Sequence, residues 1–136
     1  MTDPQAAATL FARVFLGLLF IFQGYDKLFK VGMRNVIEEF STEMQRKNVS
    51  AFFIKSGAWF TSLVEFICGG LLILGLAKYI ALYFLCLDII VVSIAFSIIR
   101  PMWDMQFVFP RVLLLIFLLL TPEEWDIISL DYFIRL

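Results

Sequence analysis

Four apolar segments, each about as long as a helix that crosses a lipid bilayer, take up most of this chain of 136 residues. A bilayer has a hydrocarbon core about 30 Å thick, so a spanning helix needs roughly 17–25 residues at a rise of about 1.5 Å per residue. The segments cover about residues 6–28, 56–77, 78–99 and 105–121. Lipid offers backbone amides no hydrogen-bond partner, so each segment is expected to be helical. The sequence therefore predicts an all-α protein, a four-transmembrane-helix bundle.

The composition supports a membrane protein that forms a single domain over residues 1–136. Hydrophobic residues make up 62% of the chain, against roughly 45–50% in soluble domains. A soluble domain of this size leaves much of its surface exposed and could not bury so much apolar area. The net charge of −1 gives no electrostatic reason to expect nucleic acid as a partner. We expect the lipid bilayer to surround the protein, and we expect the first segment to stay in place as a span.

The residue types argue against catalysis by this chain alone. Histidine is absent, so the commonest metal ligand and the usual general base at neutral pH are missing. The two cysteines, Cys68 and Cys86, are far apart in apolar segments and form no CxxC motif, which favours inert thiols. We therefore expect no metal site and no intrinsic cofactor, and we assign no catalytic residue.

The connection between the first two apolar segments predicts an amphipathic helix. Its apolar residues recur at helical spacing, while its charged residues share the opposite face. The apolar set is Val36, Ile37, Phe40 and Met44, and the charged set is Arg34, Glu38, Glu39, Glu43 and Lys47. We expect this helix to lie at the interface, on the membrane surface or on the bundle. A solvated connector is the plainer interpretation of the same pattern.

Each apolar segment carries at least one ionisable residue, and those nearest mid-membrane are Arg13, Glu65, Asp88 and Arg111. An ionised side chain at the bilayer centre costs about 2.5–3.5 kcal/mol on insertion scales, so isolated charges would be expensive. Counted from the side of the termini, all four lie at a depth of roughly 10–18 Å. Two cations and two anions also sum to zero. We therefore predict that the four side chains meet in a buried charge network or ligand pocket.

Three interpretations of this network stay open at the level of sequence. In the first, the network fixes only how the helices pack, since buried polar groups can specify register. In the second, it supports a ligand or proton site, because intramembrane ionisable residues often mark such sites. In the third, its charges face a partner subunit. Possible accessory polar residues are Gln23, Asp26 and Lys27 at the end of the first segment, and Thr61 on the same helical stripe as Glu65.

Three stretches carry a resemblance to the DoxX family of membrane proteins. The first is "RVFLGLLFIFQGYDKLF", with an arginine, glycines and a terminal lysine-leucine pair. The second is "EFICGGLLILGL", with a glutamate before a glycine-rich run. The third is "PRVLLLIFLLLTPEEWDIISLDYFI", with the arginine of the last span and a closing serine-leucine-aspartate. In this order they cover nearly the whole chain.

The resemblance implies a four-helix membrane bundle and does not settle its activity; our leading hypothesis is an accessory subunit of a quinone-linked redox complex. Relatives include subunits associated with quinol oxidases and with thiosulfate–quinone oxidoreductase. The resemblance implies a location in the bacterial inner membrane and other membrane-protein subunits as partners. It also implies that a diffusible quinone takes the place of an intrinsic cofactor. A homo-oligomer is compatible with the resemblance too. A non-catalytic scaffold or assembly factor is the alternative, and a small proton-linked transporter is a third.

Overall fold

The computed structural model describes residues 4–45, 48, 50–99 and 109–135. Within these residues every regular element is a helix, which confirms the all-α prediction. The elements, in chain order, are α1 (Pro4–Tyr25), the π-helix η1 (Asp26–Lys30), α2 (Met33–Gln45), α3 (Ala51–Leu74), α4 (Lys78–Ile99), α5 (Phe109–Leu120), the 3-10 helix η2 (Glu123–Trp125) and α6 (Leu130–Arg135).

Among the residues that the structure describes, three helices are long and apolar enough to cross a membrane. They cover Pro4–Lys30, Ala51–Leu74 and Lys78–Ala95. The fourth expected span is shorter in the structure, since α5 has 12 residues and a length of about 18 Å at the helical rise. Residues 105–108 of that expected span lie outside the described part of the chain. The structure thus shows three long apolar helices and a shorter one, and a bundle of four full spans is not confirmed.

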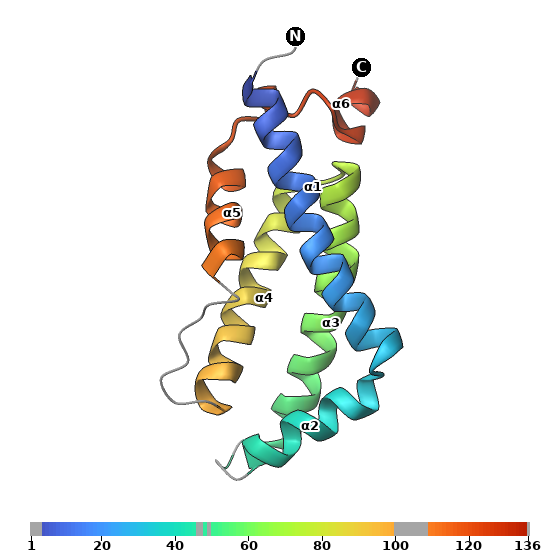
Figure 1. The fold of residues 1–136 in the computed structure, drawn as a ribbon, viewed down its shortest axis with the longest axis vertical. Coiled ribbons are helices and arrows are strands. Elements are labelled where there is room, and N and C mark those ends of the chain that lie inside the picture. The colour runs from blue at the N-terminus through green and yellow to red at the C-terminus, as the bar shows by residue number, and fades with distance from the viewer. Residues whose placement is uncertain (1–3, 46–47, 49, 100–108, 136) are drawn as a thin grey trace.

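The long helices run along one another, with α2 at one end of the bundle and both chain ends at the other (Figure 1). Antiparallel packing of α1 on α3 follows from small residues at their crossing. A Cβ atom built on Gly69 would lie 2.7 Å from the backbone nitrogen of Ile21, and one on Gly24 would lie 2.5 Å from that of Phe66. Both distances are shorter than real contacts allow, so only glycine permits the two backbones to approach so closely.

The apolar core lies between α1, α3, α4 and α5. Leu16, Phe20, Leu72, Leu85 and Leu118 are completely buried there. Large apolar side chains also cover the outside of the helices, including Phe11, Ile67, Tyr83 and Leu113, which are all more than half exposed. A soluble monomer rarely exposes apolar patches of such extent, so this surface is suited to lipid.

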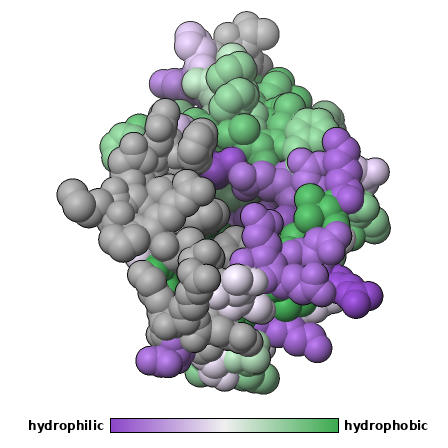
Figure 2. Space-filling view, turned by 60° about the horizontal axis from the view of Figure 1, so that its bottom comes forward, coloured by the Kyte–Doolittle hydropathy of each residue, from purple (hydrophilic) through white to green (hydrophobic). Residues whose placement is uncertain are grey.

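The helix between the first two spans is present as α2 and is amphipathic. Met33 and Val36 are buried, whereas Arg34, Glu38 and Glu39 are exposed. α2 crosses the end of the bundle and makes this face of the molecule partly hydrophilic (Figure 2). The side chains of Phe40, Glu43, Met44 and Lys47 lie outside the described part of the structure.

Candidate functional site

In the described part of the chain, buried charges form two separate groups along the bundle. The terminal charge cluster, near the chain ends, contains Arg13, Lys78 and Asp126. The central charge cluster, further down the helices, contains Lys27, Glu65, Asp88 and Arg111. Glu65 precedes Gly75 by ten residues, and Asp88 follows Lys78 by ten residues, so the clusters are about 15 Å apart along the helices.

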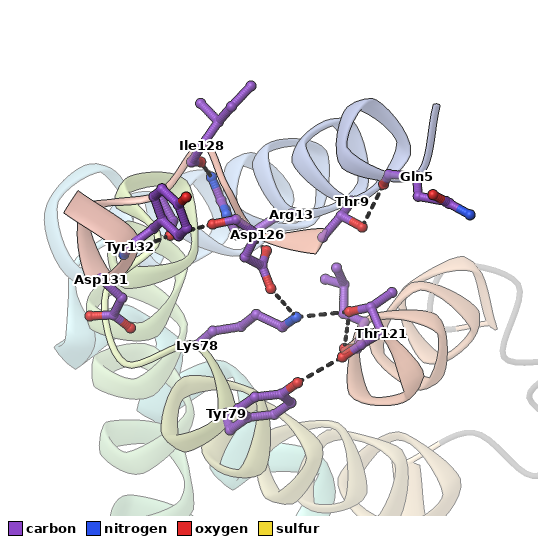
Figure 3. A network of polar contacts seen from close by, with 12 residues as sticks. Gln5, Thr9, Arg13, Lys78, Tyr79, Thr121, Asp126, Ile128, Asp131 and Tyr132 are labelled. Atoms are coloured by element: carbon purple, nitrogen blue, oxygen red, sulfur yellow. Dashed lines mark hydrogen bonds and ion pairs between the residues drawn. The ribbon is translucent and has the colours of Figure 1, made fainter. Parts of the chain in front are cut away.

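In the terminal charge cluster one carboxylate lies between two cations (Figure 3). Asp126 Oδ1 accepts a hydrogen bond from Arg13 Nη1 at 3.1 Å, and Asp126 Oδ2 accepts one from Lys78 Nζ. Lys78 also donates to Thr121 Oγ1 at 2.8 Å, and Arg13 donates to the carbonyl of Ile128. The side chains of Arg13 and Lys78 are only 2% and 6% exposed, so the pairing replaces most of their hydration.

The segment after α5 brings Asp126 to this position because it is bound to the turn between α3 and α4. Asp131 Oδ2 accepts from the backbone nitrogen of Ala77 at 2.7 Å, and the backbone nitrogen of Asp131 donates to the carbonyl of Gly75. Gly75 has a φ of 76°, and a Cβ built on it would lie 2.5 Å from Ser129 Cβ. The turn therefore requires glycine for its left-handed backbone and for this close contact.

A pocket of about 200 Å³ opens beside the terminal charge cluster. Its lining includes Arg13, Lys78, Tyr79, Asp126 and Tyr132. Arg13 Nε is buried and has no hydrogen-bond acceptor among the described residues. We call this the terminal pocket; it combines buried cations that retain donor capacity with two tyrosine rings.

The central charge cluster begins where α1 widens into the π-helix η1. Such single-turn π segments are frequent at functional sites. Here Lys27 Nζ lies 3.1 Å from Glu65 Oε2 and donates to Glu65 Oε1 at 3.2 Å. The Lys27 side chain is 26% exposed and that of Glu65 is 2% exposed. The pair therefore joins a buried carboxylate on α3 to a cation that reaches the edge of the bundle.

Asp88 is the member of the central charge cluster that α4 contributes. It is completely buried on α4, and neither of its carboxylate oxygens has a hydrogen-bond partner among the described residues. The charges of Glu65, Lys27 and Arg111 act on it. Arg111, near the start of α5, also lies over the ring of Phe20, with 5.8 Å between Cζ and the ring centre.

The structure brings together three of the four network residues that the sequence singled out. Glu65, Asp88 and Arg111 lie in the central charge cluster, as their similar depths indicated. Arg13 does not join them, because it lies level with the α3–α4 turn, with its Cζ 3.2 Å from a Cβ built on Gly75. The first turns of α1 extend beyond the ends of α3 and α4 (Figure 1), so counting from the helix start placed Arg13 too deep.

Only one of the accessory residues joins the central charge cluster. That residue is Lys27, whereas Asp26 has a half-exposed side chain whose Oδ1 lies 3.7 Å from Lys30 Nζ. Thr61 is buried, and its hydroxyl donates to the carbonyl of Ala58 on its own helix. Gln23 is half-buried, and no hydrogen bond of its side chain is found among the described residues.

Sequence reasoning missed Lys78, Thr121 and Asp126. Lys78 begins the third apolar segment and Asp126 lies beyond the fourth, so neither shares the depth on which the predicted network rests. A usable signal was present, since both residues lie at the end of the spans where Arg13 lies and carry opposite charges. Asp126, however, precedes α6 in an irregular segment, so no helical periodicity predicts its contact.

Comparison with known proteins gives one match. A family model described as DoxX matches residues 8–98, about two thirds of the chain. No curated protein and no solved structure matches the chain significantly. The matched region runs through α1 and almost to the end of α4, and it includes Lys27, Glu65 and Asp88. The resemblance inferred from the sequence motifs is thereby confirmed: this chain belongs to the DoxX family.

Proposed function

We propose that this DoxX-family membrane protein is an accessory subunit of a quinone-linked redox complex and that it binds a quinone head group in the terminal pocket. The observation that carries this proposal is the buried Arg13 Nε, which lacks an acceptor beside a cavity. A quinone ring presents two carbonyl oxygens that only accept hydrogen bonds. A quinone carbonyl thus supplies the hydrogen-bond acceptor that Arg13 Nε lacks.

The size and surroundings of the terminal pocket fit a single ring. Pockets for whole drug-sized ligands measure about 300–1,000 Å³, and this one measures about 200 Å³. Tyr79 and Tyr132 contribute aromatic surface to its lining, and aromatic rings favour offset or edge contacts with one another. The long apolar tail of a membrane quinone would remain outside, on the apolar surface of the helices.

An accessory role follows from what the chain carries. The sequence has no histidine, and both cysteines are free thiols, so the usual ligands for haem and for iron–sulfur clusters are missing or too few. Electrons for a bound quinone would come from a partner subunit that holds flavin or haem. The exposed apolar side chains of the helices offer a surface to such a partner, to lipid or to a second copy of the chain. The bacterial inner membrane is the location that we propose.

Quinone binding is tested by following thermal unfolding of the purified protein in detergent with a short-chain ubiquinone analogue. Arg13→Lys keeps the positive charge near Asp126 and removes Nε. A hydrogen bond to a charged group contributes about 1.5–3 kcal/mol, so affinity should fall about 10- to 100-fold. Tyr132→Phe is a milder change at the same pocket, and the exposed Arg34→Lys is the matched control that should leave binding unchanged. A lack of saturable stabilisation of the wild type by the analogue would refute the pocket.

The accessory role is tested separately by purifying the protein from native membranes in a mild detergent. A stable partner with a flavin or haem absorption spectrum is the expected result. A partner of the secretion or assembly machinery without such a group would favour the scaffold alternative. Recovery of the chain alone or with itself only would contradict an accessory role.

A further inference from the structure

We propose that Asp88 binds a proton, which it shares with Glu65, and that the central charge cluster is a proton-binding site inside the membrane. The inference begins with unpaired acceptors. Both oxygens of Asp88 and Oε2 of Glu65 are buried without a hydrogen bond among the described residues. Buried carboxylates are normally hydrogen-bonded, because an unsatisfied charged acceptor loses its hydration without compensation.

The groups that face Asp88 determine what can satisfy these acceptors. They come from three elements, and they are Lys27 of η1, Glu65 and Cys68 of α3, and Arg111 of α5. Lys27 is already committed to Glu65. Glu65 and Asp88 each lie ten residues from the short turn that joins α3 to α4, so their carboxyl groups lie at one level of the bundle. Glu65 Oε2 has the Lys27 ammonium beside it at 3.1 Å but makes no hydrogen bond within the described residues, and a protonated Asp88 supplies a donor to that oxygen.

A proton fits this site better than a metal ion does. A hard metal ion such as calcium requires several oxygen ligands, and the described residues contain no group of three acidic, cysteine or histidine side chains suited to a metal. A proton needs only one donor oxygen and one acceptor oxygen.

Lys27 gives the buried pair a connection to the aqueous side. Its side chain is 26% exposed, against 2% for Glu65. It lies in η1, directly before the exposed charged residues of α2 at the hydrophilic end of the molecule (Figure 2). Opening of the Lys27–Glu65 ion pair would therefore expose the carboxyl pair to protons from that side. The site is about 15 Å along the helices from the terminal pocket, and it does not depend on quinone binding there.

Infrared spectroscopy tests the proposal directly. The purified protein is labelled with ¹³C at the aspartate carboxyl groups, and the carbonyl stretch of a protonated aspartic acid is recorded at neutral pH. We expect one such band in the wild type and its loss in Asp88→Asn. Glu65→Gln should shift the band, because the hydrogen-bond acceptor changes. The exposed carboxylate variant Glu38→Gln is the matched control and should leave the band unchanged.

The wild-type measurement stands even if a variant does not fold. Absence of a protonated aspartate band at neutral pH in labelled wild-type protein would overturn the proposal. A band that persists in folded Asp88→Asn would overturn it as well. A band that disappears when sodium replaces potassium in the buffer would show that a metal ion displaces the proton, and this result would also contradict the assignment.

Discussion

Replacing Asp126 by asparagine tests the terminal charge cluster with almost no change in shape. The Asp126 carboxylate is the shared counter-ion of Arg13 and Lys78. The amide keeps one acceptor oxygen but removes the negative charge, so two buried cations remain together without compensation. Removal of one partner from a buried ion pair costs about 3–5 kcal/mol. We expect the free energy of unfolding to fall by about that amount.

The expected loss is large because whole domains are stable by only about 5–15 kcal/mol. It is measured by equilibrium unfolding in mixed micelles with increasing amounts of a denaturing detergent. Glu38→Gln is the control, since the Arg34–Glu38 pair has side chains that are 90% and 66% exposed. A helix pair of this kind contributes only about 0.3–0.5 kcal/mol.

A compensating variant separates charge from packing in this test. When Arg13→Met and Lys78→Met are combined with Asp126→Leu, no buried charge remains in the cluster. Replacement of a buried ion pair or triad by hydrophobic residues is often neutral or stabilising, so most of the lost stability should return. The electrostatic explanation fails if Asp126→Asn costs no more than Glu38→Gln.

Three further outcomes follow from other contacts. Gly69→Ala should destabilise the protein by about 1–3 kcal/mol through overpacking against α1. Gly70→Ala is the control, because its Cβ would meet only a side-chain methyl at 3.7 Å, and it should be neutral or gain up to about 1 kcal/mol of helix propensity. Equal effects of the two variants in detergent unfolding would contradict the close crossing of α1 and α3. Ala77→Gly should raise the melting temperature, because Ala77 has a φ of 47°, a conformation that costs an L-residue about 1–2 kcal/mol. A lower melting temperature would contradict the left-handed conformation of residue 77. Lys27→Met should lower the free energy of unfolding by about 1.5–3 kcal/mol, because the ion pair with Glu65 is lost. Lys30→Met should lower it by almost nothing in the same assay, because the Lys30 side chain is 72% exposed. Equal losses of stability in the two variants would contradict a stabilising Lys27–Glu65 pair.

Counting along helices predicted one half of the candidate site. The turn between α3 and α4 is short, so residues equally far from it in sequence lie at similar depth on the two antiparallel helices. This reasoning places Glu65 beside Asp88. The same count places Arg111 at the depth of Glu65 and Asp88, because Arg111 precedes Thr121 by ten residues and Thr121 lies at the same end of the bundle as the α3–α4 turn.

The other half depended on features that periodicity does not encode. The position of Arg13 depends on how far α1 slides past α3, which is set by the glycine contacts at Gly17 and Gly69. Lys27 reaches Glu65 from a π-helical turn, and an α-helical stripe does not describe that geometry. Asp126 lies between a 3-10 turn and α6, where only tertiary contacts fix the backbone.

The wide separation of Arg13 and Asp126 in sequence has a consequence for biosynthesis. The two residues that pair are 113 positions apart, so a ribosome that adds about 5–20 residues per second needs roughly 6–23 s to pass from one to the other. During that interval Arg13 has been synthesised and Asp126 has not, so their pair forms only after α3, α4 and α5 have been made. We expect a chain truncated before Asp126 to leave Arg13 and Lys78 without their shared counter-ion.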